Sequence, residues 1–169
     1  LTRDEIHAAL RKSVLDGEIA PILVGSSTKN IGVHTLLDMM IDYLPNPADL
    51  NPMVGVDLEG NEVEVLTNDE EPFSAYVFKT IVDPFLGSIN LFKIFSGSIA
   101  PGKEIYVNGQ VEKVKDLYYF SGKKQVPVDS LSAGDIGAIT KIPSVATGMT
   151  ICDPKRPVSF KVYDVPNPT

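Results

Sequence analysis

The segment PFSAYVFKTIVDPFLGSINLFKIFSGSIAPGKEIYVNGQ, residues 72–110, decides the fold. Residues 73–82 and 87–96 follow the two-residue rhythm of β-strands, in which successive side chains face opposite sides. Asn108-Gly109 is the strongest short signal for a hairpin turn. Further short β-rich runs continue to residue 163. About seven short strands separated by turn residues predict a small barrel or sandwich, and a barrel also removes exposed sheet edges.

The residues before this segment have a different rhythm. Thr2 and Glu5 form a capping box, and the apolar residues that follow keep helical spacing. Ile19–Val24 is short and β-branched, which is typical of a strand buried on both faces. A second helix with one apolar face begins near Val33 and ends before Pro45. We therefore expect a helix-strand-helix remnant of an α/β sheet over residues 1–46, whose neighbouring strands lie upstream.

Residues 47–71 join the two parts and carry most of the acidic side chains of residues 1–71. A short hairpin around Glu59–Asn61 is compatible with the sequence, but we expect residues 47–71 to be an acidic linker. Residues 1–71 hold four Lys/Arg and fourteen Asp/Glu, for a net charge of −10. Residues 72–169 hold eleven Lys/Arg and eight Asp/Glu, for a net charge of +3. The change of sign predicts two units, with 72–169 as the barrel domain, and permits contact between the barrel and an anionic partner.

Composition excludes several classes of protein. No stretch is apolar and long enough to cross a bilayer, and the first residues do not resemble a signal peptide. The single cysteine, Cys152, excludes an internal disulfide and lies in an apolar run, so we interpret it as a small buried hydrophobe in a reducing compartment.

The sequence shows no complete catalytic motif. Gly97–Lys103 matches the start of a phosphate-binding loop, but Glu104 occupies the position where Ser or Thr holds magnesium, and the segment links two strands. His7 and His34 lie on separate predicted helices and lack metal-ligand spacing. We therefore expect no metal site and no enzyme activity in this chain.

The loop Gly25–Asn30 is the candidate ligand site. It follows the carboxyl end of the predicted strand, where ligands bind in open α/β sheets, and its small residues leave backbone N–H groups accessible. Strand-to-helix loops are common, so the loop alone does not identify a ligand.

Two long stretches resemble the elongation factor G family of translational GTPases. LTRDEIHAALRKSVLDGEIAPILVGSSTKNIGVHTLLDMMIDYLPNP, residues 1–47, is similar to the end of its GTP-binding domain, and DEEPFSAYVFKTIVDPFLGSINLFKIFSGSIAPGKEIYV, residues 69–107, to the start of the following β-barrel, domain II. SAGDIGAI and GMTICDPKRPV are similar to later barrel strands. The resemblance implies an α/β remnant followed by an all-β barrel of the translation-factor type.

The resemblance also implies a role for Ser26, Ser27 and Thr28. They fall on the fifth G motif, usually Ser-Ala-x, whose backbone recognises the guanine base; Ser27 replaces Ala. The other G motifs are not found. The intact parent would therefore bind GTP or GDP with magnesium and hydrolyse GTP, whereas we expect neither nucleotide nor metal to bind this fragment.

The same resemblance implies a ribosomal partner. The barrel of the family touches small-subunit ribosomal RNA, and Lys123 and Lys124, beside the aromatic run 118–120, are our candidate RNA contacts. The alternative is a solvated turn beside core aromatics. The expected parent is a cytoplasmic translocation factor whose upstream G domain packs on residues 1–46. Alternatives are a ribosomal protection, termination or recycling GTPase or, in another class, a free-standing β-barrel interaction module.

Overall fold

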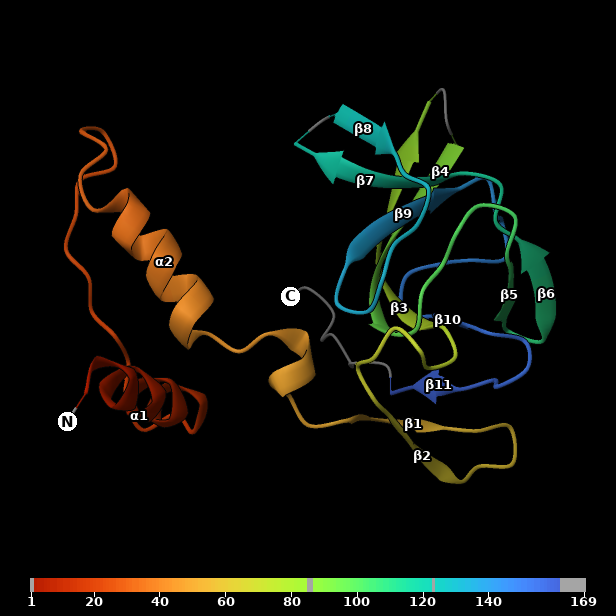
Figure 1. The fold of residues 1–169 in the computed structure, drawn as a ribbon. Coiled ribbons are helices and arrows are strands. Elements are labelled where there is room, and N and C mark those ends of the chain that lie inside the picture. Colours follow the sequence, from red (N-terminus) through yellow and green to blue (C-terminus); the bar gives the residue numbers. More distant parts are fainter. Residues whose placement is uncertain (1, 85–86, 123, 162–169) are drawn as a thin grey trace, which may run out of the picture. The chain divides into compact units, whose positions relative to one another are not determined.

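The computed structural model describes residues 2–84, 87–122 and 124–161 (Figure 1). The chain divides into two compact units, residues 1–49 and residues 50–169. Each unit is described by itself.

The first unit holds two helices, α1 (Arg3–Leu15) and α2 (Val33–Tyr43), and a short 3₁₀ turn, η1 (Pro47–Asp49). The capping box is confirmed: the Glu5 backbone N–H donates to the Thr2 hydroxyl, and the Thr2 N–H donates to the Glu5 carboxylate at 2.7 Å. The ring of His7 stacks on that of Tyr43, with centroids 5.6 Å apart. Arg11 donates to the backbone carbonyl of Asp42 at 2.8 Å, which ties the two helices together.

The predicted buried strand Ile19–Val24 is wrong for this structure. The segment is extended but forms no β-ladder with any described residue, and the side chains of Ile22 and Val24 are 92% and 93% exposed. A strand requires a neighbour to bond its backbone groups, and the described part of the chain supplies none to this segment. The apolar face of α2 is exposed as well, at Leu36, Leu37, Met40 and Ile41.

The second unit is built around an eight-stranded antiparallel sheet in the order β6-β5-β10-β3-β4-β9-β7-β8. Its strands are β3 (Ser74–Asp83), β4 (Gly87–Ser96), β5 (Glu104–Val107), β6 (Gln110–Lys113), β7 (Leu117–Ser121), β8 (Lys124–Pro127), β9 (Ile136–Thr140) and β10 (Thr150–Cys152). Asn108 and Gly109 form the predicted β5–β6 turn with φ of 45° and 84°, as a type I′ turn requires.

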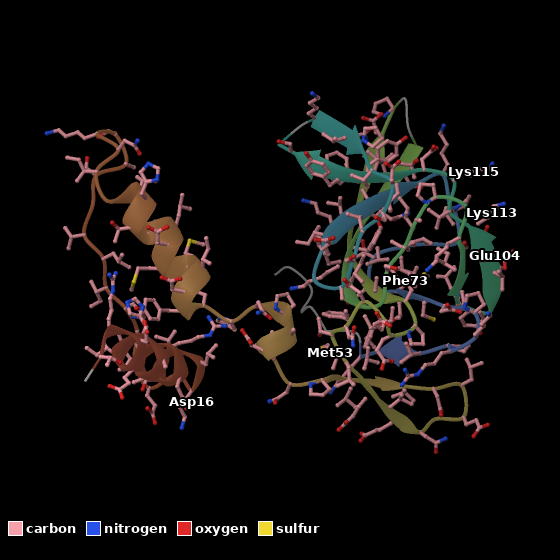
Figure 2. All side chains as sticks on the ribbon, viewed as in Figure 1. Asp16, Met53, Phe73, Glu104, Lys113 and Lys115 are labelled. Carbon is pink, nitrogen blue, oxygen red and sulfur yellow. The ribbon has the colours of Figure 1, made fainter. Side chains whose placement is uncertain are left out.

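One apolar cluster fills the interior of the barrel. Phe92, Ile94 and Ile151 are fully buried in it, and the ring of Phe73 meets that of Phe92 edge-on at 6.5 Å. Figure 2 shows where Phe73 lies in the barrel. The predicted β-barrel is confirmed. The segment Gly97–Lys103 joins strands β4 and β5 without a helix, so it lacks the helix N-terminus that a phosphate-binding loop requires.

A second, three-stranded sheet has the order β11-β1-β2, with β1 (Met53–Val56), β2 (Glu62–Val65) and β11 (Ser159–Phe160). Residues 50–71 therefore belong to the second unit, and the interpretation of 47–71 as a separate linker is wrong over this range. The allowed hairpin around Glu59–Asn61 is present. The acidic side chains of β2 are exposed while its valines face inward, a two-residue pattern that the high acid content concealed.

The small sheet is attached to the barrel by specific contacts. The ring of Phe160 meets that of Phe95 at 5.0 Å, and the Phe160 N–H donates to the Thr150 hydroxyl at 2.8 Å. Arg156 forms an ion pair with Glu71 at 2.7 Å. Cys152 is buried beneath this sheet, as predicted, and burial raises the pKa of its thiol.

Candidate functional site

The loop that carries Ser26, Ser27 and Thr28 closes on itself before α2. The Ser26 N–H donates to the Ile31 carbonyl at 2.9 Å, and the Ile31 N–H donates to the Ser26 carbonyl at 3.0 Å. This pair of bonds forms an isolated antiparallel bridge, and the Asn30 N–H donates to the Ser27 carbonyl inside it. The tip of the loop is therefore shaped by its own backbone and needs no other part of the chain.

Two glycines allow the ends of the loop to lie in backbone contact. A Cβ atom on Gly25 would lie 2.7 Å from the Ile31 carbonyl oxygen, and one on Gly32 would lie 3.0 Å from the Val24 carbonyl oxygen. Gly32 also has φ of 75°, a conformation that glycine adopts without strain. We conclude that Gly25 and Gly32 are required for the loop geometry.

A hollow of about 310 Å³ lies beside this loop. Ser26 and Ser27 line it, together with Leu23, Val33 and Leu36, whereas Thr28 does not, although the Thr28 hydroxyl lies 3.4 Å from the Ser26 hydroxyl. The lining contains apolar and small neutral groups and no charged side chain. Such a lining suits a flat neutral group, such as a purine base, and does not suit a phosphate.

Among residues 2–84, 87–122 and 124–161, no cluster of His, Cys, Asp or Glu side chains has the geometry to hold a metal ion. His7 and His34 lie on α1 and α2, as predicted, and the Nδ1 atom of His7 lies 2.7 Å from the Tyr43 hydroxyl. The hollow beside the loop is thus lined without a charged side chain.

The candidate RNA contacts lie at the β7–β8 hairpin. Lys123 lies outside the described residues. Lys124 begins β8, is exposed, and pairs with Ser121, while Tyr119 pairs with Val126. Because paired residues share a face and the face repeats every second residue, Lys124 and Tyr119 lie on the same face of the hairpin. Tyr119 is 41% exposed, so a cation and an accessible ring are presented together.

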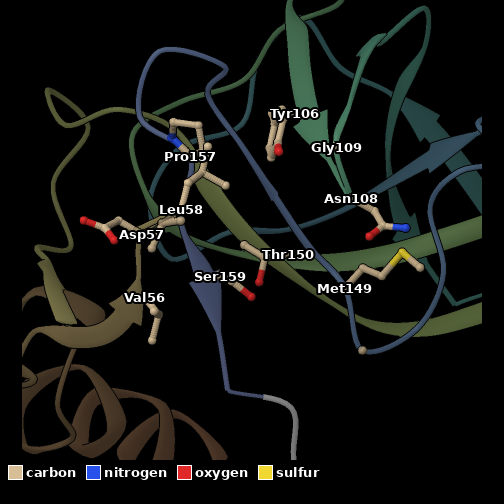
Figure 3. Close-up of a pocket in the computed structure, with 12 residues that line it drawn as sticks. Val56, Asp57, Leu58, Tyr106, Asn108, Gly109, Met149, Thr150, Pro157 and Ser159 are labelled. Atoms are coloured by element: carbon tan, nitrogen blue, oxygen red, sulfur yellow. The ribbon is translucent and has the colours of Figure 1, made fainter. Parts of the chain in front are cut away.

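A further hollow was not predicted from the sequence. It has a volume of about 340 Å³ and opens at the seam between the small sheet and the barrel (Figure 3). Its walls come from four separate segments of the chain, so no local sequence motif predicts it. We call it the seam pocket.

Comparison with known proteins identifies the barrel. Residues 72–154 match the family model described as elongation factor G domain 2. Over these residues the barrel is similar to elongation factor G domain 2. The chain also resembles a crystal structure of a protein from Thermus thermophilus, with a TM-score of 0.74 and 25% sequence identity over 98% of this chain. The resemblance to elongation factor G and the expected barrel are thus confirmed.

This chain corresponds to 23% of the length of the Thermus thermophilus protein that it resembles. The similarity therefore extends through both units of the chain but covers only a part of that protein. None of the helices in the described ranges has the length and hydrophobicity needed to span a bilayer.

Proposed function

We propose that this chain forms the guanine-side wall and the ribosome-docking barrel of an elongation factor G-like translocation GTPase. The observation that carries the proposal is the order of its parts: a Ser26-Ser27 loop beside a neutral hollow, followed along the chain by a domain 2 barrel. In the parent, GTP or GDP with magnesium would bind, and the backbone around Ser26, Ser27 and Thr28 would contact the base. The parent would act in the cytoplasm, where translation takes place.

The exposed apolar surface of the first unit supports an upstream G domain as the neighbour of residues 1–46. Ile22 and Val24 are almost fully exposed, and so is much of the apolar face of α2. A segment with strand-like composition and no ladder partner gains most from pairing with a strand outside this range. The described residues contain no cluster of His, Cys, Asp or Glu that could hold a metal ion, and we propose that the chain does not hydrolyse GTP alone.

Calorimetry with GDP tests the nucleotide part of the proposal. The 169-residue chain is expected to give no heat of binding, whereas the full-length parent binds. In the parent, Ser27→Ala should preserve affinity because a backbone contact does not need the hydroxyl. Ser27→Phe should weaken binding, because its ring would occupy the hollow that Ser27 lines. Tight binding of GDP by this chain alone would contradict the proposal.

Co-sedimentation with small ribosomal subunits tests the docking part. Lys124→Glu and Tyr119→Ala should each reduce binding, because one removes a phosphate contact and the other a stacking surface. Lys113→Glu is the matched control, since Lys113 on β6 and the hairpin of β7 and β8 lie on different sides of the barrel (Figures 1 and 2). Equal loss in all three variants would indicate non-specific attraction of a basic surface, and no loss in any would remove the β7–β8 hairpin from the interface.

A further inference from the structure

The ladder between β5 and β10 ends before β10 does. The two strands pair at Tyr106 and Cys152, and continuing that antiparallel register would place Asn108 opposite Thr150. Asn108 has instead entered the β5–β6 turn, with a φ of 45°. The strands separate there, and the space between them forms one side of the seam pocket, which Asn108 and Thr150 both line (Figure 3).

This separation leaves an open hydrogen-bonding edge at Thr150. The Met149 carbonyl accepts from the Val77 N–H on β3 at 2.9 Å, whereas Cys152 pairs with β5. Because alternate residues of a strand bond to opposite neighbours, Thr150 turns its backbone N–H and carbonyl toward β5, as Cys152 does. No residue is paired with Thr150 on that edge, and no backbone group of a described turn or loop bonds to it.

The other side of the seam pocket is held in place by the small sheet. Ser159 pairs with Val56, and both line the hollow. The Thr150 hydroxyl accepts a hydrogen bond from the backbone N–H of Phe160 at 2.8 Å, which holds β11 beside β10. Both walls therefore consist of hydrogen-bonded backbone, so the hollow is formed before any ligand arrives.

Asp57 is the single charged side chain among the described residues that line the hollow, and its charge is directed elsewhere. Its carboxylate points away from Tyr106 and Thr150 (Figure 3). The carboxylate accepts hydrogen bonds from the backbone N–H groups of Glu59 and Asn61, each at 2.9 Å, and is thus engaged within its own turn. The rest of the lining offers no charge to a phosphate or to a cation.

Apolar side chains stand beside the open edge. Leu58 is 70% exposed and Met149 is half-buried, and both line the hollow. Tyr106 and Cys152 are paired and therefore share a face, and Thr150, two residues from Cys152, shares it too. A ligand residue paired with Thr150 would place its side chain on this same face, next to Tyr106 and Leu58.

We propose that the seam pocket binds an extended peptide segment of a partner protein by strand addition. A donor and an acceptor on one residue of a strand edge are complemented by another peptide residue, which exchanges two N–H···O hydrogen bonds with it. One residue of the ligand pairs with Thr150 in this way, and its apolar side chain packs against Leu58 and Tyr106. The volume of about 340 Å³ limits the bound segment to a few residues. This contact does not depend on the proposed function.

Amide NMR of the ¹⁵N-labelled chain tests the proposal. The probe is the capped tripeptide acetyl-Gly-Val-Gly-amide. The control is the same peptide with N-methylvaline, which lacks the N–H that the Thr150 carbonyl would accept. The valine peptide should shift the amides of Leu58, Asn108, Met149 and Thr150 in a saturable manner. The N-methylvaline peptide should bind more weakly by about fivefold or more, because one hydrogen bond is lost.

Hydrogen exchange at Thr150 gives a second readout. In the free chain the Thr150 amide should exchange faster than that of Cys152, which is paired with Tyr106. At a valine-peptide concentration of ten times the Kd, exchange at Thr150 should slow by about tenfold, because the bound amide is protected.

Two leucine variants test the side-chain contact. Leu58→Ala should weaken the valine peptide by about two- to fivefold, because it removes apolar surface from the hollow. Leu66→Ala is the matched control, since Leu66 is also exposed, at 49%, and is not part of the lining. Neither leucine is buried, so both variants are expected to fold.

Several outcomes would overturn the proposal. These are an absence of saturable shifts, equal binding of the valine and N-methylvaline peptides, unchanged exchange at Thr150 in the presence of the peptide, or equal loss in the two leucine variants. Preferential binding of a single-stranded oligouridine at the same amides would also overturn it, because it would assign the hollow to a nucleic acid.

Discussion

The two units of this chain handle apolar side chains in opposite ways. In residues 50–169, Phe92, Ile94 and Ile151 are fully buried within one cluster. In residues 1–49, Tyr43 is the single described hydrophobic side chain that is buried, and the apolar faces of both helices remain exposed. The barrel therefore contains its own source of stability, whereas the helical unit has the surface pattern of a part that packs against something else.

Removing a large side chain from each unit should give the largest contrast. Phe92→Ala should destabilise the barrel by about 3–5 kcal/mol, because it removes a fully buried ring and leaves a cavity. Leu37→Ala, at a residue that is 50% exposed, should change stability by about 0.5 kcal/mol or less. Urea unfolding followed by far-ultraviolet circular dichroism measures both. Similar losses in the two variants would mean that the helical unit has a core of its own.

Alanine substitutions of glycine in the two units should differ by an intermediate amount in stability. Gly97 and Gly17 have φ of 68° and 74°, so alanine is strained at both. A Cβ on Gly97 would also lie 2.4 Å from the Glu71 carbonyl oxygen, whereas a Cβ on Gly17 meets nothing within 4 Å. Gly97→Ala should lower the free energy of unfolding by about 1–3 kcal/mol more than Gly17→Ala does, because only the alanine at 97 would push neighbouring backbone atoms aside. Thermal unfolding of the two variants checks the difference, and equal midpoints would contradict it.

The smallest expected effect is on the stability of the chain at low pH. The pKa of Asp57 is lowered from 3.8 in the folded state, chiefly by the Asn61 backbone hydrogen bond. Because the folded pKa lies below the unfolded one, the stabilisation is present above the unfolded pKa and is lost as the pH falls through the folded value. Below about pH 3.8 the wild-type chain should therefore lose stability more steeply than Asp57→Asn. Parallel curves of urea midpoint against pH would show that this carboxylate contributes nothing.

The barrel could be predicted from sequence because its signals are local. Asn108-Gly109 specifies its hairpin through backbone conformation alone, and the long runs on either side of Pro84 repeat every two residues. The pairing of β11 with β1 could not be predicted, because it joins residues about a hundred positions apart through a strand of two residues.

The candidate sites divide in the same way. The loop at Ser26 and Ser27 was found because a family motif covers it, and the structure adds the hollow beside it. The seam pocket was missed because Asp57, Tyr106 and Thr150 come together only through the tertiary fold. The prediction of a strand at Ile19–Val24 was wrong for a third reason. Composition indicates which structure a segment can form, but a β-ladder also requires a neighbouring strand.

The pairing of β11 with β1 has a mechanical consequence. Gly55 lies opposite Phe160 and Val56 opposite Ser159, so the start of β1 and the end of β11 lie at the same end of an antiparallel pair. Tension applied through the chain before residue 53 and after residue 160 would open this pair one rung at a time, as a zipper opens, instead of loading all its hydrogen bonds together. A force of that kind would peel away the small sheet first and spare the eight-stranded barrel until the sheet had separated.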